Sequence, residues 1–233
     1  MNVNNTTIKI FQKGFNYSQD GQGNRLVLHL QGCNMKCPWC SNPEGMPVDG
    51  VVMKERRKEK LSCKEYMLEE VVNECVRSMP MFFDGGGVTL TGGEISMQFE
   101  AVKELLAMLK VQGINTAIES NGSHPRMEEL VPLVDQWIMD VKHYDDAKHK
   151  AWVGVSNENT TKTLQNVSKV HTNMLVRVPL IPGFNDSEED ARCFAEYFAD
   201  NIDEKNRMEG HIKVEFLVYH EFGKQKWEQC GWE

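Results

Sequence analysis

Short apolar runs alternate with amphipathic segments along most of the chain. Six of these runs are rich in aliphatic, β-branched and aromatic residues and predict strands at Leu26–Leu30, Val88–Thr91, Thr116–Glu119, Trp137–Val141, Leu175–Pro179 and Ile212–Leu217. Segments with apolar residues at helical spacing separate them. This alternation is typical of a parallel sheet wound with crossover helices.

Local signals at the segment ends predict where helices begin and end. Ser62 followed by Glu65 matches a capping box, which predicts a helix that starts there and ends at Pro80. Other helix signals are the apolar spacing from Met97 to Gln112 before Gly113, Pro125 in a first turn, and Ser187 before Glu188, Glu189 and Asp190.

Six strand-helix units are fewer than the eight of a closed barrel. We therefore expect an α/β fold with an open, partial (βα)6 barrel, in one domain that spans residues 1–233. In parallel α/β folds, ligands bind at the carboxyl ends of the strands. The residues at or just past these ends are Gly92, Gly93, Glu94, Glu119, Ser120, Asp140, Lys142, Arg177 and His220.

Composition and charge narrow the class of protein. The net charge of -8 and pI near 5.5 argue against a nucleic-acid partner, which would normally require a basic face. No apolar run approaches the roughly 20 residues of a membrane span. We expect a cytoplasmic protein, monomeric, with no contact to membranes.

Three cysteines are clustered early in the chain. Cys33, Cys37 and Cys40 are separated by three and two residues, and no fourth cysteine follows closely. A four-iron four-sulfur (4Fe-4S) cluster usually has a thiolate on each iron, so three ligands leave one iron open. This spacing favours a catalytic cluster over an electron carrier.

The same cysteines allow two simpler interpretations. Zinc could bind the three thiolates together with His29, although His29 lies in an apolar run that predicts a buried strand. A disulfide is disfavoured because seven cysteines without a signal peptide indicate a reducing compartment.

The motif Cys33-x3-Cys37-x2-Cys40, with Trp39 before the last cysteine, resembles the radical S-adenosylmethionine (radical SAM) enzymes. Further segments resemble the glycyl-radical-enzyme activases of the pyruvate formate-lyase activating type, in the family's order: Asp20–Arg25, Gln31–Cys33, Cys40–Glu44, Gly85–Glu94, Val153–Asn157, Ile181–Asp186 and Tyr219–Trp227. This resemblance implies a reduced 4Fe-4S cluster and S-adenosylmethionine, which generate a 5'-deoxyadenosyl radical. The radical removes a hydrogen from a glycine of a partner glycyl radical enzyme.

The same resemblance implies a role for each matching residue. Cys33, Cys37 and Cys40 hold the cluster on a loop at about residues 31–45, and Asp20 contacts the substrate peptide. The cofactor contacts it implies are Trp39, Ser41, Asn42, Gly92, Gly93, Glu94, Glu119, Ser120, Asp140, Lys142, Arg177 and His220.

One motif departs from the pyruvate formate-lyase type. That type has Asp-Thr-Asn-Gly where this chain has Glu119-Ser-Asn-Gly122. In the family this segment, with the aspartate that matches Asp140, helps to hold a monovalent cation. Glu119 keeps the charge and Ser120 keeps an oxygen, so the resemblance still allows a cation beside the cofactor.

The remaining cysteines are scattered. Cys63 and Cys75 fall in one predicted helix, Cys193 lies in another, and Cys230 lies near the chain end. They are expected to be buried small hydrophobes. Because residues 41–62 contain no cysteine, we expect no ferredoxin-like insert with further clusters.

A basic run covers residues 54–60. It is typical of a solvated face, and the alternative is a docking site for a flavodoxin- or ferredoxin-type reductant. Other functions also stay open: a different radical SAM enzyme acting on a small molecule or peptide, an electron-transfer protein, and a zinc-binding module.

Overall fold

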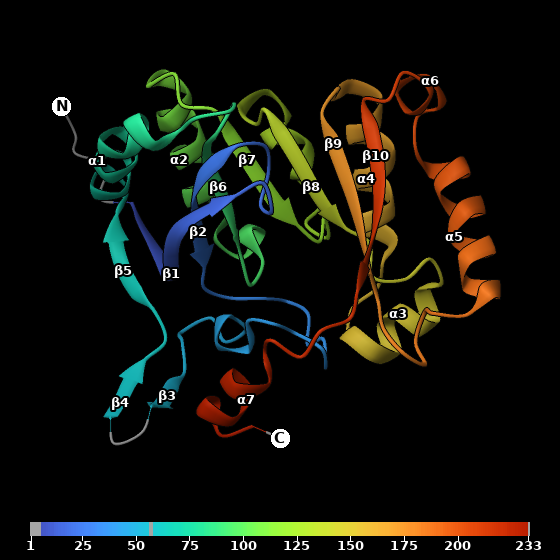
Figure 1. Cartoon of the computed structure of the whole chain (residues 1–233), viewed down its shortest axis with the longest axis horizontal. Helices are drawn as coiled ribbons and strands as arrows, with labels where there is room; N and C mark the ends of the chain where they lie inside the picture. The colour runs from blue at the N-terminus through green and yellow to red at the C-terminus, as the bar shows by residue number, and fades with distance from the viewer. Residues whose placement is uncertain (1–5, 56–57, 233) are drawn as a thin grey trace.

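The computed structural model describes residues 6–55 and 58–232. Its main sheet has eight strands in the order β10-β9-β8-β7-β6-β2-β1-β5 (Figure 1). The parallel strands are β2 (Asn24–Leu30), β6 (Gly87–Gly92), β7 (Thr116–Ser120), β8 (Gln136–Asp140), β9 (Met174–Leu180) and β10 (Ile212–Val218). They match the six predicted strands, and the prediction of an open, partial (βα)6 barrel in a single domain is confirmed.

Side chains alternate between the two faces of each parallel strand. In β2, Leu26, Leu28 and Leu30 belong to the main apolar core. The alternate residues, such as Arg25 and His29, point to the inside of the barrel, as expected from the period of two. The barrel interior, here called the lumen, therefore contains many polar side chains, and the apolar face of the sheet is turned toward the helices.

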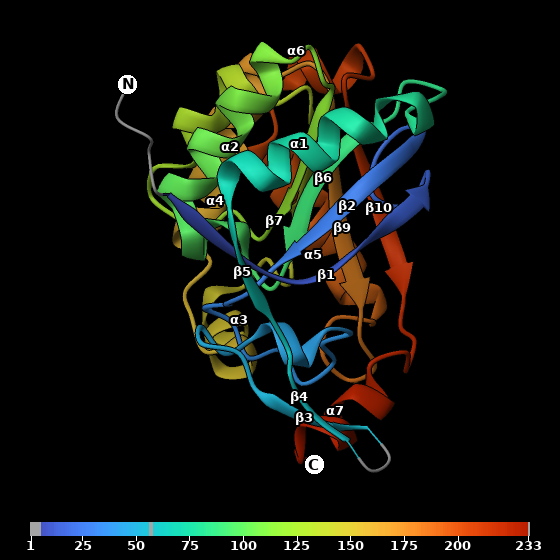
Figure 2. The ribbon, with the colours of Figure 1, turned by 90° about the vertical axis from the view of Figure 1, so that its left-hand side faces the viewer.

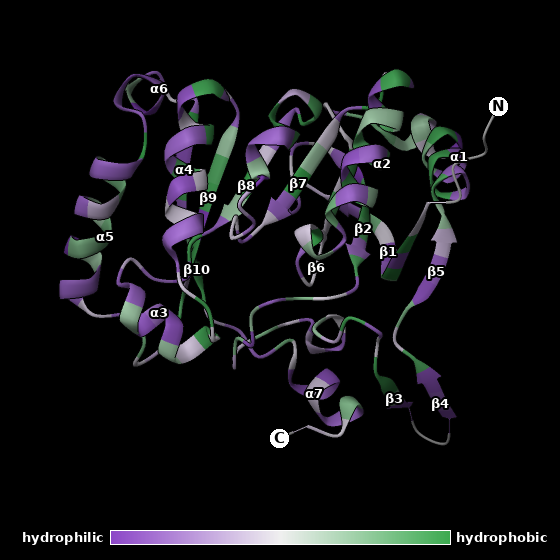
Figure 3. Ribbon diagram, turned by 180° about the vertical axis from the view of Figure 1, so that it is seen from behind, coloured by the Kyte–Doolittle hydropathy of each residue, from purple (hydrophilic) through white to green (hydrophobic). Residues whose placement is uncertain are grey.

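Four helices cover that outer face. They are α1 (Leu68–Ser78), α2 (Phe99–Val111), α4 (Glu158–Val170) and α5 (Glu188–Asn201), with the 3-10 segments η2 (Met79–Met81), η3 (Ile95–Gln98) and η4 (Met127–Leu133) between elements. Seen from behind, α4 shows mainly hydrophilic residues on its outward side (Figure 3). The shorter helices α3 (Asp146–Val153), α6 (Glu204–Met208) and α7 (Lys224–Cys230) lie at the barrel ends.

Two predicted helix boundaries are confirmed. Ser187 caps α5, because its Oγ accepts from Asp190 N at 3.1 Å and Asp190 Oδ2 accepts from Ser187 N at 3.2 Å. Helix α2 ends at Val111, and Gly113 follows with φ +68°, a conformation that favours glycine.

The predicted capping box at Ser62 is wrong. Residues 64–67 form β5 (Lys64–Met67), which pairs antiparallel with β1, and α1 begins only at Leu68. Ser62 Oγ instead accepts from Val51 N at 3.0 Å. Cys63 therefore lies before a strand and not in a helix, because pairing with β1 outweighs the local helix signal.

The segment after Pro125 also differs from the prediction. Pro125 precedes the first turn by two residues, and the segment is the 3-10 helix η4. Pro132 lies inside it and supplies no N–H, so a continuous α-helix does not form there.

Strand β1 (Thr7–Tyr17) was not predicted. It carries many polar residues and pairs antiparallel with β2 over most of its length. The loop after it, residues 18–23, lies under the lumen, since Gln22 N donates to Gln136 Oε1 at 2.9 Å and Gln19 O accepts from Arg177 Nη2 at 2.6 Å. The loop thus reaches from one side of the barrel to the other.

A small hairpin projects beside the C-terminal helix. Strands β3 (Val52–Glu55) and β4 (Lys58–Leu61) form it, and α7 contacts β3 (Figure 2). The basic run falls on this hairpin, although its residues 56 and 57 lie outside the described residues. None of the helices within 6–55 and 58–232 combines the length and apolarity that a membrane crossing requires.

Candidate functional site

A cavity lies at the carboxyl ends of the parallel strands. Its volume is about 240 Å³, somewhat below that of ordinary small-molecule sites (roughly 300–1,000 Å³). The predicted site residues that line it are Cys33, Cys37, Trp39, Cys40, Ser41, Asn42, Gly92, Gly93, Glu94, Glu119, Ser120, Asp140, Lys142 and His220. The structure brings these residues together from five separate parts of the chain.

The loop of residues 31–45, here called the cluster loop, leaves β2 and folds back on itself. Gly32 N donates to Gly45 O at 2.8 Å, and Cys33 N donates to Met46 O at 2.9 Å. These bonds tie the two ends of the loop together. The three thiols are therefore carried on a closed turn.

Gly93 packs directly against this turn. A Cβ added at Gly93 would lie 2.3 Å from Gly32 O and 2.6 Å from Gly45 O, both backbone atoms. Glu94 N also donates to Gly32 O at 2.7 Å. The glycine is required because two backbones meet there, and its neighbour Gly92 has φ +129°.

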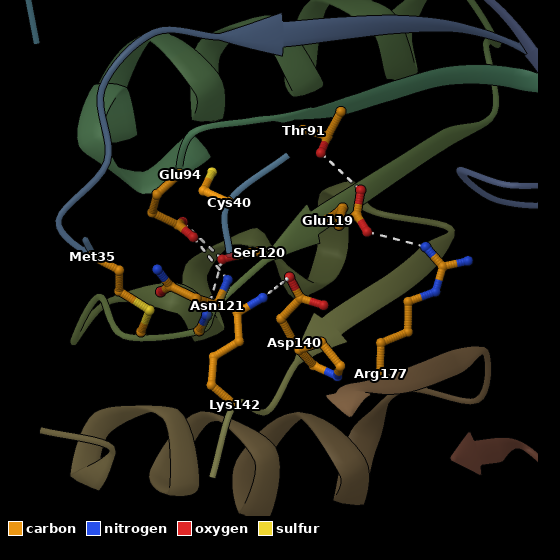
Figure 4. Close-up of polar contacts among 12 residues, drawn as sticks. Met35, Cys40, Thr91, Glu94, Glu119, Ser120, Asn121, Asp140, Lys142 and Arg177 are labelled. Carbon is orange, nitrogen blue, oxygen red and sulfur yellow. Dashed lines mark hydrogen bonds and ion pairs between the residues drawn. The ribbon is translucent and has the colours of Figure 1, made fainter. Parts of the chain in front are cut away.

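The Glu94 carboxylate is engaged entirely within the protein. It is 1% exposed and accepts from Ser96 N at 2.9 Å, Ser120 Oγ at 2.8 Å and Asn121 N at 2.8 Å (Figure 4). Glu94 therefore ties the end of β6 to the end of β7. Its side chain positions the cavity wall.

A second carboxylate lies deeper in the lumen. Glu119 accepts from Thr91 Oγ1 at 2.8 Å and from Arg177 Nη1 at 3.0 Å (Figure 4). Burial, and then the nearby Asp140 carboxylate, raise the pKa of Glu119 above its usual range. Burial lowers the pKa of Arg177, but Glu119, Asp140 and Glu215 together raise it above its ordinary value. Arg177 is thus a fixed positive charge below the cavity.

Asp140 and Lys142 form an ion pair in the cavity wall. Lys142 Nζ donates to Asp140 Oδ2 at 2.8 Å, and both side chains are mostly buried. Burial opposes the charge on Lys142, yet Asp140 raises its pKa above the ordinary value. The pair faces the three cysteines, whereas most charged residues lie on the surface.

A sequence model of the radical SAM superfamily matches residues 27–194, which is more than half of the chain. The chain belongs to the radical SAM superfamily. Enzymes of this superfamily use a 4Fe-4S cluster and S-adenosylmethionine. The matched residues include the cluster loop and the strands that line the cavity.

Curated relatives within the superfamily are activating enzymes. The choline trimethylamine-lyase activating enzyme of Oleidesulfovibrio alaskensis is 32% identical over 92% of this chain and 84% of the relative. Pyruvate formate-lyase 1-activating enzyme of Escherichia coli K12 is 32% identical over 92% of this chain and 81% of the relative. The predicted resemblance to glycyl-radical-enzyme activases is confirmed, and the other radical SAM classes are not favoured.

A solved structure supports the fold alone. SuiB of Streptococcus suis, bound to its precursor peptide SuiA, aligns with a TM-score of 0.58 at 15% identity. The alignment covers 84% of this chain and 39% of SuiB. The two proteins therefore share the partial-barrel fold.

The chemistry of the donors fits the radical SAM cluster. Burial raises the pKa of all three thiols, to about 12 for Cys37. Bound iron would supply the positive charge that keeps them as thiolates. Met35 N donates to Cys33 Sγ and Asn42 N donates to Cys40 Sγ, both at 3.4 Å, which suits a charged sulfur.

Trp39 adds a second indication of a bound group. Its Nε1 is buried and has no hydrogen-bond partner among the described residues, although the side chain lines the cavity. Its ring packs against Phe184 with centroids 4.9 Å apart. This donor is therefore free to bond to an acceptor of a group bound in the cavity.

The zinc alternative lacks its ligand set. In residues 6–55 and 58–232, no three His, Cys, Asp or Glu side chains converge as ligands of one ion. His29 packs against Phe11, with ring centroids 5.5 Å apart, and burial lowers its pKa. Cluster ligands bind different irons and need not converge on one point.

Two predicted residues lie outside the cavity wall. Arg177 reaches the cavity only through Glu119. Asp20 lies in the loop under the lumen, where Asn16 Nδ2 donates to its carboxylate and its backbone carbonyl accepts from Thr89 Oγ1 at 2.6 Å. His220 lines the cavity but is exposed and stacks on Phe222, with centroids 4.1 Å apart.

The residues predicted for a monovalent cation are turned toward protein partners. Glu119 faces Arg177 and Thr91, and Ser120 Oγ donates to Glu94. Asp140 is paired with Lys142. The extra methylene of glutamate, relative to the aspartate of the pyruvate formate-lyase type, extends the Glu119 carboxylate toward Arg177.

The sequence interpretation missed several residues that line this cavity, and three of them lie in the cluster loop or beside the carboxylates. Thr91, Asn121 and Met35 line the cavity, and Thr91 and Asn121 hold the two carboxylates. Thr91 could have been found, because the period of two places it on the lumen face beside Leu90 on the core face. Asn121 could not, since its donor is a backbone N–H.

Proposed function

We propose that this chain activates a partner glycyl radical enzyme. It would bind one 4Fe-4S cluster on Cys33, Cys37 and Cys40 and one S-adenosylmethionine in the adjoining cavity. When bound and reduced, these groups supply the radical that takes a hydrogen atom from a glycine of the partner. The observation that carries the proposal is the convergence of three thiols, the Gly92–Glu94 turn and the Asp140–Lys142 pair on one cavity.

The chain's own residues would bind and orient the cofactors. Gly93 lets the turn approach the cluster loop closely, and Glu94 holds the ends of β6 and β7 together. Lys142 and Asp140 offer one positive and one negative group to the amino acid part of S-adenosylmethionine. Trp39, Ser41, Asn42 and His220 would contact the rest of the cofactor from the rim of the cavity.

The lumen below the cavity offers a place for the substrate glycine. Asp20 is carried there by the loop of residues 18–23, and Arg177 holds that loop through Gln19 O at 2.6 Å. A glycine inside another protein is out of reach, so the partner would release its glycine loop in an order-disorder step. Asp20 would then contact the incoming peptide.

We further propose where the enzyme works, its oligomeric state, its electron donor and the number of clusters it binds. It would work in the cytoplasm as a monomer and receive electrons from a flavodoxin- or ferredoxin-type protein. The described part of residues 41–62 forms a 3-10 turn and a hairpin, which supports a single cluster per chain with no ferredoxin-like insert. A monovalent cation beside the cofactor would take Glu119, Ser120 and Asp140 as its ligands. These side chains would then have to turn away from Arg177, Glu94 and Lys142.

The test is anaerobic mixing of the reconstituted protein with candidate glycyl radical enzymes, followed by electron paramagnetic resonance. The expected result is a glycyl radical with the correct partner, and about four irons per chain. With deuterium on the α-carbon of the target glycine, deuterium should appear in 5'-deoxyadenosine. Its absence would show that the hydrogen comes from another substrate.

Variants of the other four cysteines are the control for variants of the three clustered cysteines. Replacing Cys33, Cys37 or Cys40 by Ala should remove the cluster and the radical. Replacing Cys63, Cys75, Cys193 and Cys230 together by Ser should leave both in place, since these cysteines lie far apart on separate segments. Eight or more irons per chain would contradict the single-cluster proposal.

A further inference from the structure

The C-terminal helix α7 lies against the cluster loop, 187 residues from it in sequence. Trp227 Nε1 donates to the carbonyl oxygen of Cys40 at 2.9 Å. Gly223, just before the helix, approaches the same oxygen so closely that an added Cβ would lie 2.4 Å from it. Helix α7 therefore contacts the backbone of a cluster ligand directly.

Lys226, on the same helix, holds the next turn of the loop. Its Nζ donates to Asn42 Oδ1 at 2.6 Å and pairs with Glu44 Oε1 at 2.7 Å. Glu44 is only 5% exposed, and this ammonium group is its charged partner. The four contacts fix residues 40–44 between α7 and the body of the barrel.

The held segment contains a hydrogen bond to a ligand sulfur. Asn42 N donates to Cys40 Sγ at 3.4 Å. Trp227 fixes the carbonyl of Cys40, and Lys226 fixes the side chain of Asn42. The two α7 residues thus set both ends of the turn that points this N–H at the sulfur.

We propose that Trp227 and Lys226 are positioning residues that raise the reduction potential of the cluster. N–H donors to the ligand sulfurs and nearby positive charge stabilise the reduced, more negative cluster. Neither residue lies among the ligands or the predicted cofactor contacts, and both act through the Cys40–Glu44 turn. The inference rests on the proposed function, because it assumes a cluster on the three cysteines.

The test is a redox titration of the reconstituted protein, followed by electron paramagnetic resonance of the reduced cluster. In Trp227→Phe, the ratio of reduced to oxidised cluster at a fixed potential should fall about tenfold, which is about 59 mV for one electron. Lys226→Met should shift the potential in the same direction. Lys226→Arg keeps the charge and the donors, and should stay close to wild type.

Trp232→Phe is the matched control for Trp227. Its ring packs on Trp227 with centroids 5.8 Å apart, yet no hydrogen bond to the cluster loop is described for it. This variant should keep the wild-type potential. A shift equal to that of Trp227→Phe would mean that general packing of α7 matters, and would overturn the proposed role.

A second measurement needs no cluster. Hydrogen exchange of the Asn42 amide in the apo protein should be faster in Trp227→Phe and Lys226→Met than in Trp232→Phe. The double variant Glu44→Gln, Lys226→Met removes both charges of the buried pair. It replaces Lys226→Met in both measurements if that single variant does not fold. Unchanged potential and unchanged exchange in these variants would overturn the inference, whereas a wild-type protein without a cluster would overturn the proposed function instead.

Discussion

Arg177 on β9 and Glu119 on β7 form an ion pair at 3.0 Å, although β8 lies between their strands. Arg177 also donates to Glu215 Oε2 at 3.1 Å and to Gln19 O at 2.6 Å. The Arg177 guanidinium on β9 therefore links β7, β10 and the loop of residues 18–23. Only a planar group with several donors can serve all three acceptors.

Arg177→Lys is expected to weaken both the fold and cofactor binding. Lysine keeps the charge but cannot reach the three acceptors at once, so at least one charge-assisted hydrogen bond is lost. The expected loss is about 1.5–3 kcal/mol in the free energy of unfolding. Denaturant unfolding and anaerobic titration with S-adenosylmethionine measure the two effects. Arg192→Lys, on an exposed side chain of α5, should change neither.

Glu94→Gln should destabilise the cavity wall. The amide would turn one of its acceptors into a donor, although Glu94 accepts from two backbone N–H groups and one hydroxyl. A buried donor left unpaired costs about 1–3 kcal/mol. Ser120→Ala removes a single hydrogen bond and should cost less. If both variants unfolded at the wild-type denaturant concentration, Glu94 would have no role in holding β6 to β7.

Gly93→Ala should disturb the cluster loop. Its new methyl group would press on the carbonyl oxygens of Gly32 and Gly45, so the loop has to move. We expect a loss of about 1–3 kcal/mol in stability and fewer irons retained per chain. Gly14→Ala is the control, because a Cβ there meets nothing within 4 Å. Equal iron content in both variants would contradict the close approach.

His143 should make the stability of the apo protein depend on pH. Its Nδ1 accepts from Asp145 N at 2.9 Å and its Nε2 contacts Phe184 O at 3.3 Å, which requires a neutral ring. Burial, and then Lys148, lower its pKa below 6.5, against the opposing effects of Phe184 O, Asp190 and Asp145. The unfolded chain therefore binds a proton that the folded chain does not.

Stability should consequently fall as the pH drops below about 6.5, by up to roughly 1.4 kcal/mol per pH unit for one such group. His143→Asn keeps an acceptor near the position of Nδ1 and cannot be protonated. Between pH 7.5 and 5.5, the free energy of unfolding of this variant should therefore fall less than that of the wild type. His29 and His149 also have lowered pKa values because of burial, so some pH dependence should remain.

The sequence predicted the parallel strands because their lumen and core residues alternate with a clear period. It did not predict β1, whose polar residues resemble those of a loop until β2 and β5 pair with it. The Ser62 signal was misleading for the same reason. Strand β5 pairs with β1, about 58 residues earlier in the sequence, and this pairing outweighs a local helix cap.

The candidate site was predicted unevenly. The cysteine spacing and the Gly92–Glu94 turn located it, because their chemistry depends on short segments of the chain. The sequence did not show that Glu94 and Glu119 would be held by protein donors, since those donors come from other strands. The contact of Trp227 with Cys40 was equally hidden, because only the folded chain brings the two together.

The alternation of side chains along the parallel strands separates two tasks. Outward-facing residues such as Leu28 and Val176 carry the apolar burial that keeps the barrel folded, and inward-facing residues such as Arg177 and Glu215 form polar contacts in the lumen. A substitution at an inward position therefore removes little apolar burial, whereas an outward substitution acts directly on the core. The charge and shape of the lumen can thus be altered separately from the apolar layer that surrounds it.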